Sequence, residues 1–304
     1  MTLGGCRLCG AEAELRESHI LPAFLYKWMK DTSVTGRIRL GVSPNRRVQD
    51  GLKRRWLCAN CEARFSKWES AFAARIFHPY SSRVSARFDY DSFLIRFCTS
   101  VSWRVLLFHQ DEGYCAHLPE DVISRTEEAA EKWRAVLLER SADPNPFEQH
   151  LLPLEAIESH NVPEVPRNIN RYLVRAIDMD VVYGRSSSFL YSKLGRFIIL
   201  GFLQLNNPGH WQGTKVEAAG GFIEPKKYTL PADFVDYLFH KAKRLAELNS
   251  QISSAQRKKI EEAFRRNRDR IAKSDDFYAL SHDVRLFGKA VFQRKSDETS
   301  ESEQ

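Results

Sequence analysis

Residues 6–10 read CRLCG and residues 57–62 read LCANCE, and these two stretches decide how the N-terminal part of the chain folds. Each stretch holds one Cys-x-x-Cys pair, and the four thiols come from Cys6, Cys9, Cys58 and Cys61. Two such pairs form a tetrahedral all-cysteine zinc site that needs no other ligand. We therefore expect a structural zinc ion on which the folding of this part depends.

The segment between the two pairs is longer than a minimal zinc ribbon requires, because 48 residues separate Cys9 from Cys58. It contains ESHILP at residues 17–22, and His19 is the most reactive side chain there. We expect His19 to lie on a strand. The two remaining cysteines of the chain have apolar neighbours in the sequence, and we expect them to be buried thiols without a chemical role.

Composition limits the class of protein. The chain has 304 residues and is 43% hydrophobic, which suits one large or two modest globular domains. No apolar run reaches the roughly 18 residues needed to span a bilayer. The N-terminus lacks a basic segment followed by an apolar one, so we expect a cytoplasmic protein with no membrane partner. In a reducing compartment, paired cysteines indicate metal binding rather than disulfides.

The positive charge of the chain is concentrated at its N-terminal end. Residues 1–90 contain 16 lysines and arginines against 8 acidic residues, whereas the rest contains 30 against 31, and the whole chain has a formal charge of +7. This asymmetry predicts a polyanionic partner for the N-terminal part. The alternative is a solvated basic surface that binds nothing.

The pattern of the chain predicts an α+β protein. We expect a zinc-binding module at residues 1–90, followed by a mixed helical and antiparallel-sheet domain at residues 91–295. In the module, the sequence predicts a helix at residues 23–30, a β-hairpin around the Asp50-Gly51 turn and a helix opened by Cys61. A zinc knuckle, a hairpin and a second knuckle at a helix start follow each other in a treble-clef zinc finger.

The second domain combines helices and strands. We expect helices over residues 91–140, an irregular connection over 141–170, strands over 171–206 and further helices over 231–293. Residues 296–304 are acidic and polar, and we expect them to be disordered. No motif in this domain indicates what it recognises.

The motifs CxxC, SHIxP and LCxxCE resemble the HNH endonuclease family of the ββα-metal superfamily. Many of its members have a CxxC pair, an Asp-His-Ile-x-Pro motif and a Leu-Cys-x-x-Cys-His motif. The resemblance covers roughly residues 4–75. The variant with SHI-P and CE resembles a divergent, HNH-like bacterial branch of the family. The resemblance implies a treble-clef ββα-metal fold that hydrolyses phosphodiester bonds of DNA. By analogy of fold alone, phage defence is a conceivable setting.

The resemblance also implies roles for three residues. His19 would be the general base that deprotonates water. Glu62 stands where the family has a metal-binding histidine, and its carboxylate suits Mg²⁺ or Mn²⁺ as catalytic ion. Glu69 follows two helical turns later on the same face and could supply a further carboxylate. The alternatives are a structural role for His19 and, for Glu62, a favourable acidic residue in the first helical turn.

The sequence also departs from the family pattern. Ser18 stands where the family has a metal-binding Asp or Glu, and Glu17 before it would point to the opposite face of the strand. The middle asparagine of the family has no clear counterpart, and Asn45, Gln49 and Asp50 are the candidates. The metal site is therefore either altered or lost.

Five basic residues flank the Asp50-Gly51 turn. On a hairpin they would form a positive ridge whose phosphate contacts position a nucleic acid, DNA rather than RNA, without reading its sequence. These residues are Arg46, Arg47, Lys53, Arg54 and Arg55.

Two other functions stay open. The module could be a zinc finger that binds nucleic acid or a protein without catalysis, or the chain could be a scaffold subunit with its basic helix near residues 257–273 at an interface. In each case residues 91–295 are the candidate for selecting a substrate or a protein partner.

Overall fold

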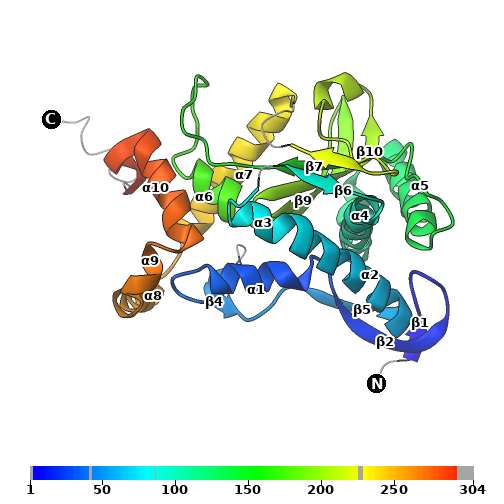
Figure 1. Cartoon of the computed structure of the whole chain (residues 1–304), viewed down its shortest axis with the longest axis horizontal. Helices are drawn as coiled ribbons and strands as arrows, with labels where there is room; N and C mark the ends of the chain where they lie inside the picture. The colour runs from blue at the N-terminus through cyan, green and yellow to red at the C-terminus, as the bar shows by residue number, and fades with distance from the viewer. Residues whose placement is uncertain (1–2, 41–42, 86, 225–228, 293–304) are drawn as a thin grey trace. The chain divides into compact units, whose positions relative to one another are not determined.

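The computed structural model describes residues 3–40, 43–85, 87–224 and 229–292, and it is a mixed α and β structure, as predicted (Figure 1). The chain divides into two compact units, each assembled from separate stretches of sequence. The first unit comprises Met1–Lys27, Asp50–Leu154 and Ile177–Pro231. The second unit comprises Trp28–Gln49, Glu155–Ala176 and Ala232–Gln304. The expected boundary at residue 90 therefore lies within the first unit.

A three-stranded antiparallel sheet in the first unit connects the two cysteine pairs. Its strands are β1 (Leu3–Gly5), β2 (Glu12–His19) and β5 (Lys53–Cys58), in the order β1-β2-β5. The β2–β5 register sets Leu15 opposite Cys58. Leu15 and Ser18 are the buried residues of β2.

The predicted hairpin around Asp50-Gly51 is wrong. Strand β4 (Ser43–Val48) pairs with β3 (Ile38–Leu40) in the second unit, whereas β5 pairs with β2. The reason is burial: the C-terminal half of β5, Trp56–Cys58, is buried and packs with β2 and the helix that follows. A turn dipeptide fixes a local bend, but the partner of a strand is chosen by the surface that it buries.

Helix α2 (Ala59–Phe72) begins directly after β5 and places one apolar stripe in the core. Cys61, Phe65, Trp68 and Phe72 recur at helical spacing and are all buried. The helix continues through the π-helical turn η1 (Ala73–Phe77) into α3 (His78–Ser81). The Phe72 ring stacks on Phe97 of the next long helix, with ring centroids 4.1 Å apart, so α2 is held in the core.

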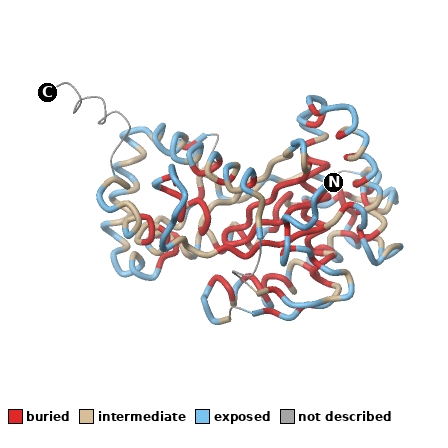
Figure 2. Tube along the Cα trace, turned by 90° about the horizontal axis from the view of Figure 1, so that it is seen from above, coloured by how far each residue is buried: buried red, intermediate tan, exposed pale blue. Residues whose placement is uncertain are grey.

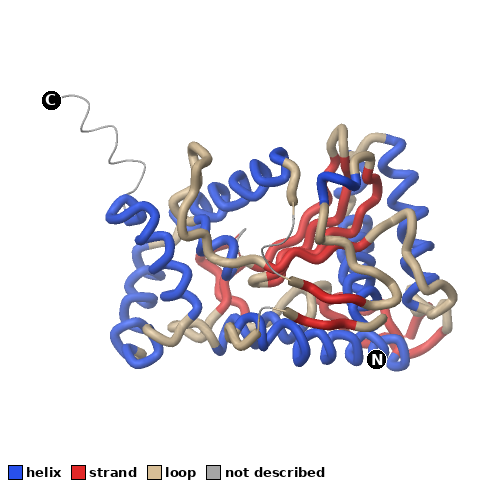
Figure 3. The backbone as a smooth tube through the Cα atoms, turned by 45° about the horizontal axis from the view of Figure 1, so that its top comes forward, coloured by secondary structure: helices blue, strands red, loops and turns tan. Residues whose placement is uncertain are grey.

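Helix α4 (Phe93–Asp111) is the central helix of the first unit, and most of its residues are buried. Figure 2 colours the buried residues of the described chain red. It packs against α2, against α5 (Glu120–Leu137) and against a four-stranded antiparallel sheet. That sheet has the order β7-β10-β9-β8, and its strands lie side by side in Figure 3. The strands are β7 (Gln149–Pro153), β8 (Ile177–Tyr183), β9 (Ser187–Leu194) and β10 (Phe197–Leu205).

Short elements complete the first unit. Strands β6 (Phe88–Tyr90) and β11 (Gly221–Ile223) pair with each other. Two 3-10 helices, η2 (Tyr114–His117) and η3 (Pro208–Trp211), lie in its connections. Strand β7 forms within the stretch expected to be irregular, because it joins the edge of the sheet beside β10.

The second unit is largely helical. Helix α1 (Ala23–Asp31) enters it from the first unit, and its other elements are helical apart from the β3–β4 pair. They are α6 (Ile169–Arg175), α7 (Ala232–Ser250), α8 (Ser254–Arg266), α9 (Arg268–Ile271), α10 (Asp275–Phe287) and the 3-10 helix η4 (Gly288–Phe292). The expected disordered tail, residues 296–304, lies outside the described residues.

Helix α6 replaces the first part of a predicted strand. Its first turn donates backbone N–H groups of Asn170 and Arg171 to the buried carboxylate of Asp283 in α10. A carboxylate at a helix N-terminus satisfies donors that the helix itself leaves free. This partner is more than a hundred residues away in sequence, so the periodicity of residues 171–206 could not indicate it.

Within the described part of the chain, no helix is both long enough and apolar enough to cross a membrane.

Candidate functional site

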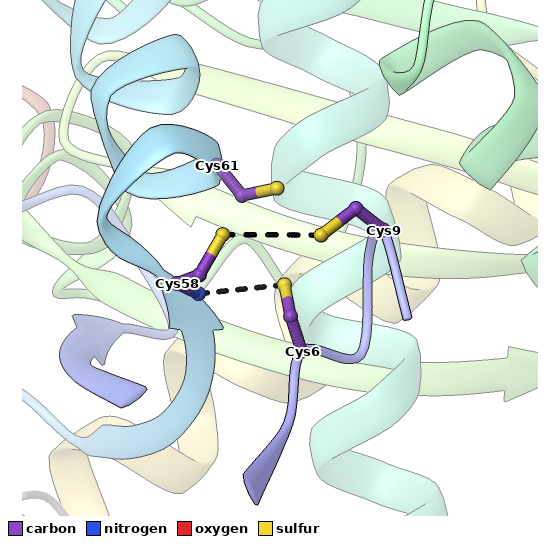
Figure 4. A group of neighbouring side chains, drawn as sticks. All are labelled: Cys6, Cys9, Cys58 and Cys61. Atoms are coloured by element: carbon purple, nitrogen blue, oxygen red, sulfur yellow. Dashed lines mark hydrogen bonds between the residues drawn. The ribbon is translucent and has the colours of Figure 1, made fainter. Parts of the chain in front are cut away.

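The four predicted zinc ligands converge at one end of the small sheet, where the β1–β2 turn meets the junction of β5 and α2, as Figure 4 shows. Cys6 and Cys9 lie on the turn between β1 and β2, Cys58 ends β5, and Cys61 lies in the first turn of α2. Gly10 closes the turn with a φ of 80°, a left-handed conformation that favours glycine. Sequence spacing alone therefore identified a cluster that two separate elements build.

The sulfur positions suit a tetrahedral metal ion. The four Sγ atoms lie within 4.8 Å of one another, and Cys9 Sγ is 3.8 Å from Cys58 Sγ. Zinc–sulfur bonds of about 2.3 Å in a tetrahedron separate the sulfurs by about 3.8 Å. All four cysteines are free thiols rather than disulfides. The cluster could therefore bind a metal ion such as zinc.

The thiols differ in how readily they ionise. Burial raises the pKa of Cys6, but backbone N–H groups donated toward its sulfur, among them that of Cys58 at 3.4 Å, bring the pKa down to about 7. Burial, followed by the neighbouring cysteines, raises the pKa of Cys61. Four adjacent thiolates repel one another, so a divalent cation is the charge that this donor set calls for.

The other two cysteines lie away from this cluster and are buried, as predicted. Cys98 lies in α4 and Cys115 in η2. Burial raises the pKa of the Cys115 thiol to about 11.

His19 ends β2 and is held by a carboxylate. Its Nε2 lies 2.8 Å from Asp50 Oδ1, while Asp50 Oδ2 is 2.8 Å from the Lys53 ammonium. Burial raises the pKa of Asp50, but hydrogen bonds from Lys53 and His19 outweigh it and bring the pKa to about 2. The His19 ring also stacks on Tyr26 at 5.9 Å. Of the three candidates for the middle position, the structure therefore brings Asp50 to the histidine.

Ser18 faces the opposite way from His19, since neighbouring strand residues point to opposite faces. It is fully buried, and its Oγ donates a hydrogen bond of 2.5 Å to Glu62 Oε2 in the first turn of α2. Ser18 and Glu62, which the sequence placed in one candidate metal site, therefore contact each other.

Glu69 has a different neighbour. Its Oε1 lies 2.7 Å from Nη2 of Arg104, a buried side chain of α4, in an ion pair that is not aligned as a hydrogen bond. Arg104 also donates to the backbone carbonyl of His19 at 2.8 Å and to that of Ser100 at 3.1 Å. Its guanidinium lies over the Phe65 ring, 5.2 Å from the centroid. Glu69 therefore neutralises a buried arginine.

No second group of donors accompanies the cysteines. Within the residues that the structure describes, the cysteine cluster is the only group of three or more Cys, His, Asp or Glu side chains close enough to share a metal ion. Glu62 is therefore a single carboxylate with a serine hydroxyl beside it.

The five predicted basic residues do not form one ridge. Lys53, Arg54 and Arg55 lie on β5 in the first unit, whereas Arg46 and Arg47 lie on β4 in the second unit. The expectation failed because the two strands are not partners. The three cations of β5 are also neutralised: Lys53 by Asp50 at 2.8 Å, Arg54 by Glu112, and Arg55 by Glu17 at 3.3 Å.

Sequence reasoning missed Arg104. The signal was present, because one arginine interrupts the otherwise apolar stretch SVSWRVLLF at residues 100–108. Arginine is almost never fully buried unless it is paired. A charged residue inside a buried helix therefore predicts a partner, although it does not identify which one.

Comparison with protein-family models, with curated proteins and with solved structures finds no match to this chain.

Proposed function

We propose that the protein is a metal-dependent endonuclease of the HNH type with a structural zinc ion in a treble-clef module. The observation that carries this proposal is a pair of contacts at the end of β2. His19 pairs with Asp50, and Ser18, the residue directly before His19, contacts Glu62. Strand, strand and helix meet there in the order that the sequence resemblance implies. The cysteine cluster joins the same three elements.

The role of zinc would be structural. Cys6, Cys9, Cys58 and Cys61 would hold it, and four sulfurs leave no open coordination position for a substrate. The ion would join the β1–β2 turn to the junction of β5 and α2. Because Ser18 and His19 lie on β2 and Glu62 lies in the first turn of α2, a zinc ion that joins these parts of the module would fix the positions of the catalytic groups.

His19 would act as general base. Asp50 is ionised near neutral pH, so its carboxylate accepts a hydrogen bond from His19 Nε2–H and leaves Nδ1 with a lone pair. That lone pair can take a proton from water as the oxygen attacks a phosphodiester phosphorus. Arg104 would help to fix the position of this base, because its guanidinium donates a hydrogen bond to the His19 carbonyl.

Glu62 would hold a catalytic Mg²⁺ or Mn²⁺, with the Ser18 hydroxyl donating to its other side. Such ions are often bound through one or two carboxylates, several waters and the phosphates of the substrate. When bound, the ion would supply charge that stabilises the scissile phosphate. The substrate would be DNA, encountered in the cytoplasm, and residues 91–295 would select it or a protein partner.

The test is cleavage of supercoiled plasmid by zinc-loaded protein with Mg²⁺, Mn²⁺ or no added divalent ion. His19→Ala should lower the cleavage rate about 10²-fold or more. His240→Ala is the matched control, because His240 is exposed on α7 in the second unit. Cleavage that survives His19→Ala, or that needs no divalent ion, would contradict this proposal.

One observation favours a second function. Glu62 already accepts a hydrogen bond from Ser18, and serine is a poor metal ligand. The pair would then be what is left of a metal site that no longer binds an ion. The module would then bind nucleic acid without cutting it. Wild type and His19→Ala would retard plasmid equally in a gel shift and neither would cleave it.

A further inference from the structure

Two arginines face each other across the β3–β4 pair. Arg39 on β3 is the direct register partner of Arg47 on β4. Side chains of directly opposed residues in an antiparallel pair lie on the same face, about 5 Å apart at Cβ, and like charges placed this way repel. Arg37 lies two residues before Arg39, just ahead of β3, and its charge also acts on Arg39. The second unit thus carries a repulsive cationic cluster.

Acidic groups do not relieve this repulsion. Within the described residues, Arg37, Arg39, Arg46 and Arg47 make no ion pair with Asp or Glu. Burial first, and then the charges of Arg47 and Arg37, lower the pKa of Arg39. The Nε of Arg47 is buried and has no hydrogen-bond partner among the described atoms.

The contrast with β5 is informative, because each of its three cations has a carboxylate partner. A folded protein pairs or solvates its cations, and it seldom sets two arginines opposite each other without a reason. Neutral groups hold Arg39 in place: its Nη1 donates to the Pro44 carbonyl and to Gln256 Oε1, both at 3.3 Å. The cluster is therefore positioned but not neutralised.

We propose that Arg39 and Arg47 form a phosphate-binding site for the backbone of a nucleic acid. A guanidinium presents a fork of N–H donors that matches phosphate oxygens, and a phosphate between two guanidinium groups would turn their repulsion into attraction. The proposal rests on the proposed function for the source of the phosphates. It goes beyond it by pairing Arg47 with Arg39 in one binding contact, on a strand pair that belongs to the second unit.

Helix α8 explains why a long polyanion fits better than a single anion. Its residue Gln256 contacts Arg39, and none of its residues is buried. The helix also carries several more cations, namely Arg257, Lys258, Lys259, Arg265 and Arg266. The helix also carries Glu261 and Glu262, and Glu262 pairs with Arg266. Its cations still outnumber its carboxylates, so a net positive charge continues from the arginine pair along an exposed helix, which suits a repeating phosphate backbone.

The experiment measures binding rather than cleavage. Zinc-loaded protein is titrated into a fluorescently labelled DNA duplex at several KCl concentrations, without added Mg²⁺ or Mn²⁺. The double variant Arg39→Gln/Arg47→Gln is compared with Arg54→Gln/Arg55→Gln, which removes the same charge from arginines that have acidic partners. The salt slope is the change of log K with log[KCl], and it is negative. Each lost phosphate contact lowers its magnitude by about 0.9. Because the two arginines share one phosphate, we expect a decrease of about 0.9 for the first variant and a smaller one for the second.

An equal change in both double variants, or an unchanged slope in Arg39→Gln/Arg47→Gln, would overturn the proposal. So would equal competition by polyglutamate of matched charge, since the surface would then serve acidic proteins. The thermal midpoint of the variant should stay level or rise, because repulsion is removed. If the double variant fails to fold, Arg47→Gln alone should lower the magnitude of the slope in the same direction, by at most about 0.9. Failure of cleavage in the plasmid assay would leave this result unaffected, so the two proposals fail separately.

Discussion

Replacement of Glu69 by glutamine should destabilise the protein far more than it impairs any reaction. The carboxylate of Glu69 neutralises Arg104, whose side chain is only 2% exposed. The amide of glutamine keeps the shape but not the charge, so the variant would leave an uncompensated guanidinium in the core. We therefore expect Glu69 to contribute to stability, although its position on α2 made it a candidate catalytic carboxylate.

The magnitude follows from the surroundings of the pair. Removal of one partner of a buried ion pair costs about 3–5 kcal/mol. Two features favour the lower end: Arg104 keeps hydrogen bonds to two backbone carbonyls, and Glu69 is 17% exposed, so water can approach the vacated site. We expect about 3 kcal/mol. With a urea m-value near 3 kcal/mol/M, the unfolding midpoint would fall by about 1 M.

The assay is urea unfolding of zinc-loaded protein followed by tryptophan fluorescence and far-ultraviolet circular dichroism. Glu62→Gln is the matched control, because Glu62 lies on the same helix and keeps an acceptor for Ser18; we expect it to cost less than about 1 kcal/mol. In the double variant Glu69→Gln/Arg104→Met the cost should be smaller than the sum of the single variants. A loss below about 1 kcal/mol for Glu69→Gln, or additive single variants, would refute the reasoning.

Three further predictions concern the metal, the pH and the packing. Purified protein should contain one zinc per chain by elemental analysis, and Cys58→Ser should lose the metal and unfold at lower temperature, whereas Cys98→Ser should keep the metal. Because folding lowers the pKa of Asp50 to about 2, its contribution to stability should be present above about pH 4 and lost as the pH falls through about 2; Asp50→Asn should remove this dependence in acid-unfolding curves. Gly51→Ala should lower the unfolding free energy by about 1–3 kcal/mol, because a Cβ there would overlap the Tyr26 ring, and an unchanged urea midpoint would contradict that contact.

The elements encoded by neighbouring residues could be predicted well. The spacing of the cysteines indicated a four-thiol cluster, and all four sulfurs converge. Apolar periodicity indicated the helices that became α2, α4 and α5. Both signals are local, because a knuckle or a helical stripe is complete within a few turns of chain.

Which strands pair and which charges are neutralised was decided only by tertiary structure. The sequence offered Asn45, Gln49 and Asp50 as candidates for the middle position of the motif, and β5 joined β2 so that Asp50 reached the His19 ring. The same pairing removed the expected hairpin and set Arg39 opposite Arg47 instead.

The physical reason is range. A helix or a metal knuckle takes most of its pattern from residues close in sequence, whereas strand partners and buried ion pairs depend on groups that meet only after the core has formed. Arg104 and Glu69 are 35 positions apart along the chain and touch because α2 packs on α4. The sequence by itself therefore determined the cysteine cluster and the helices α2, α4 and α5, whereas tertiary packing decided which histidine, carboxylate and arginine groups lie together.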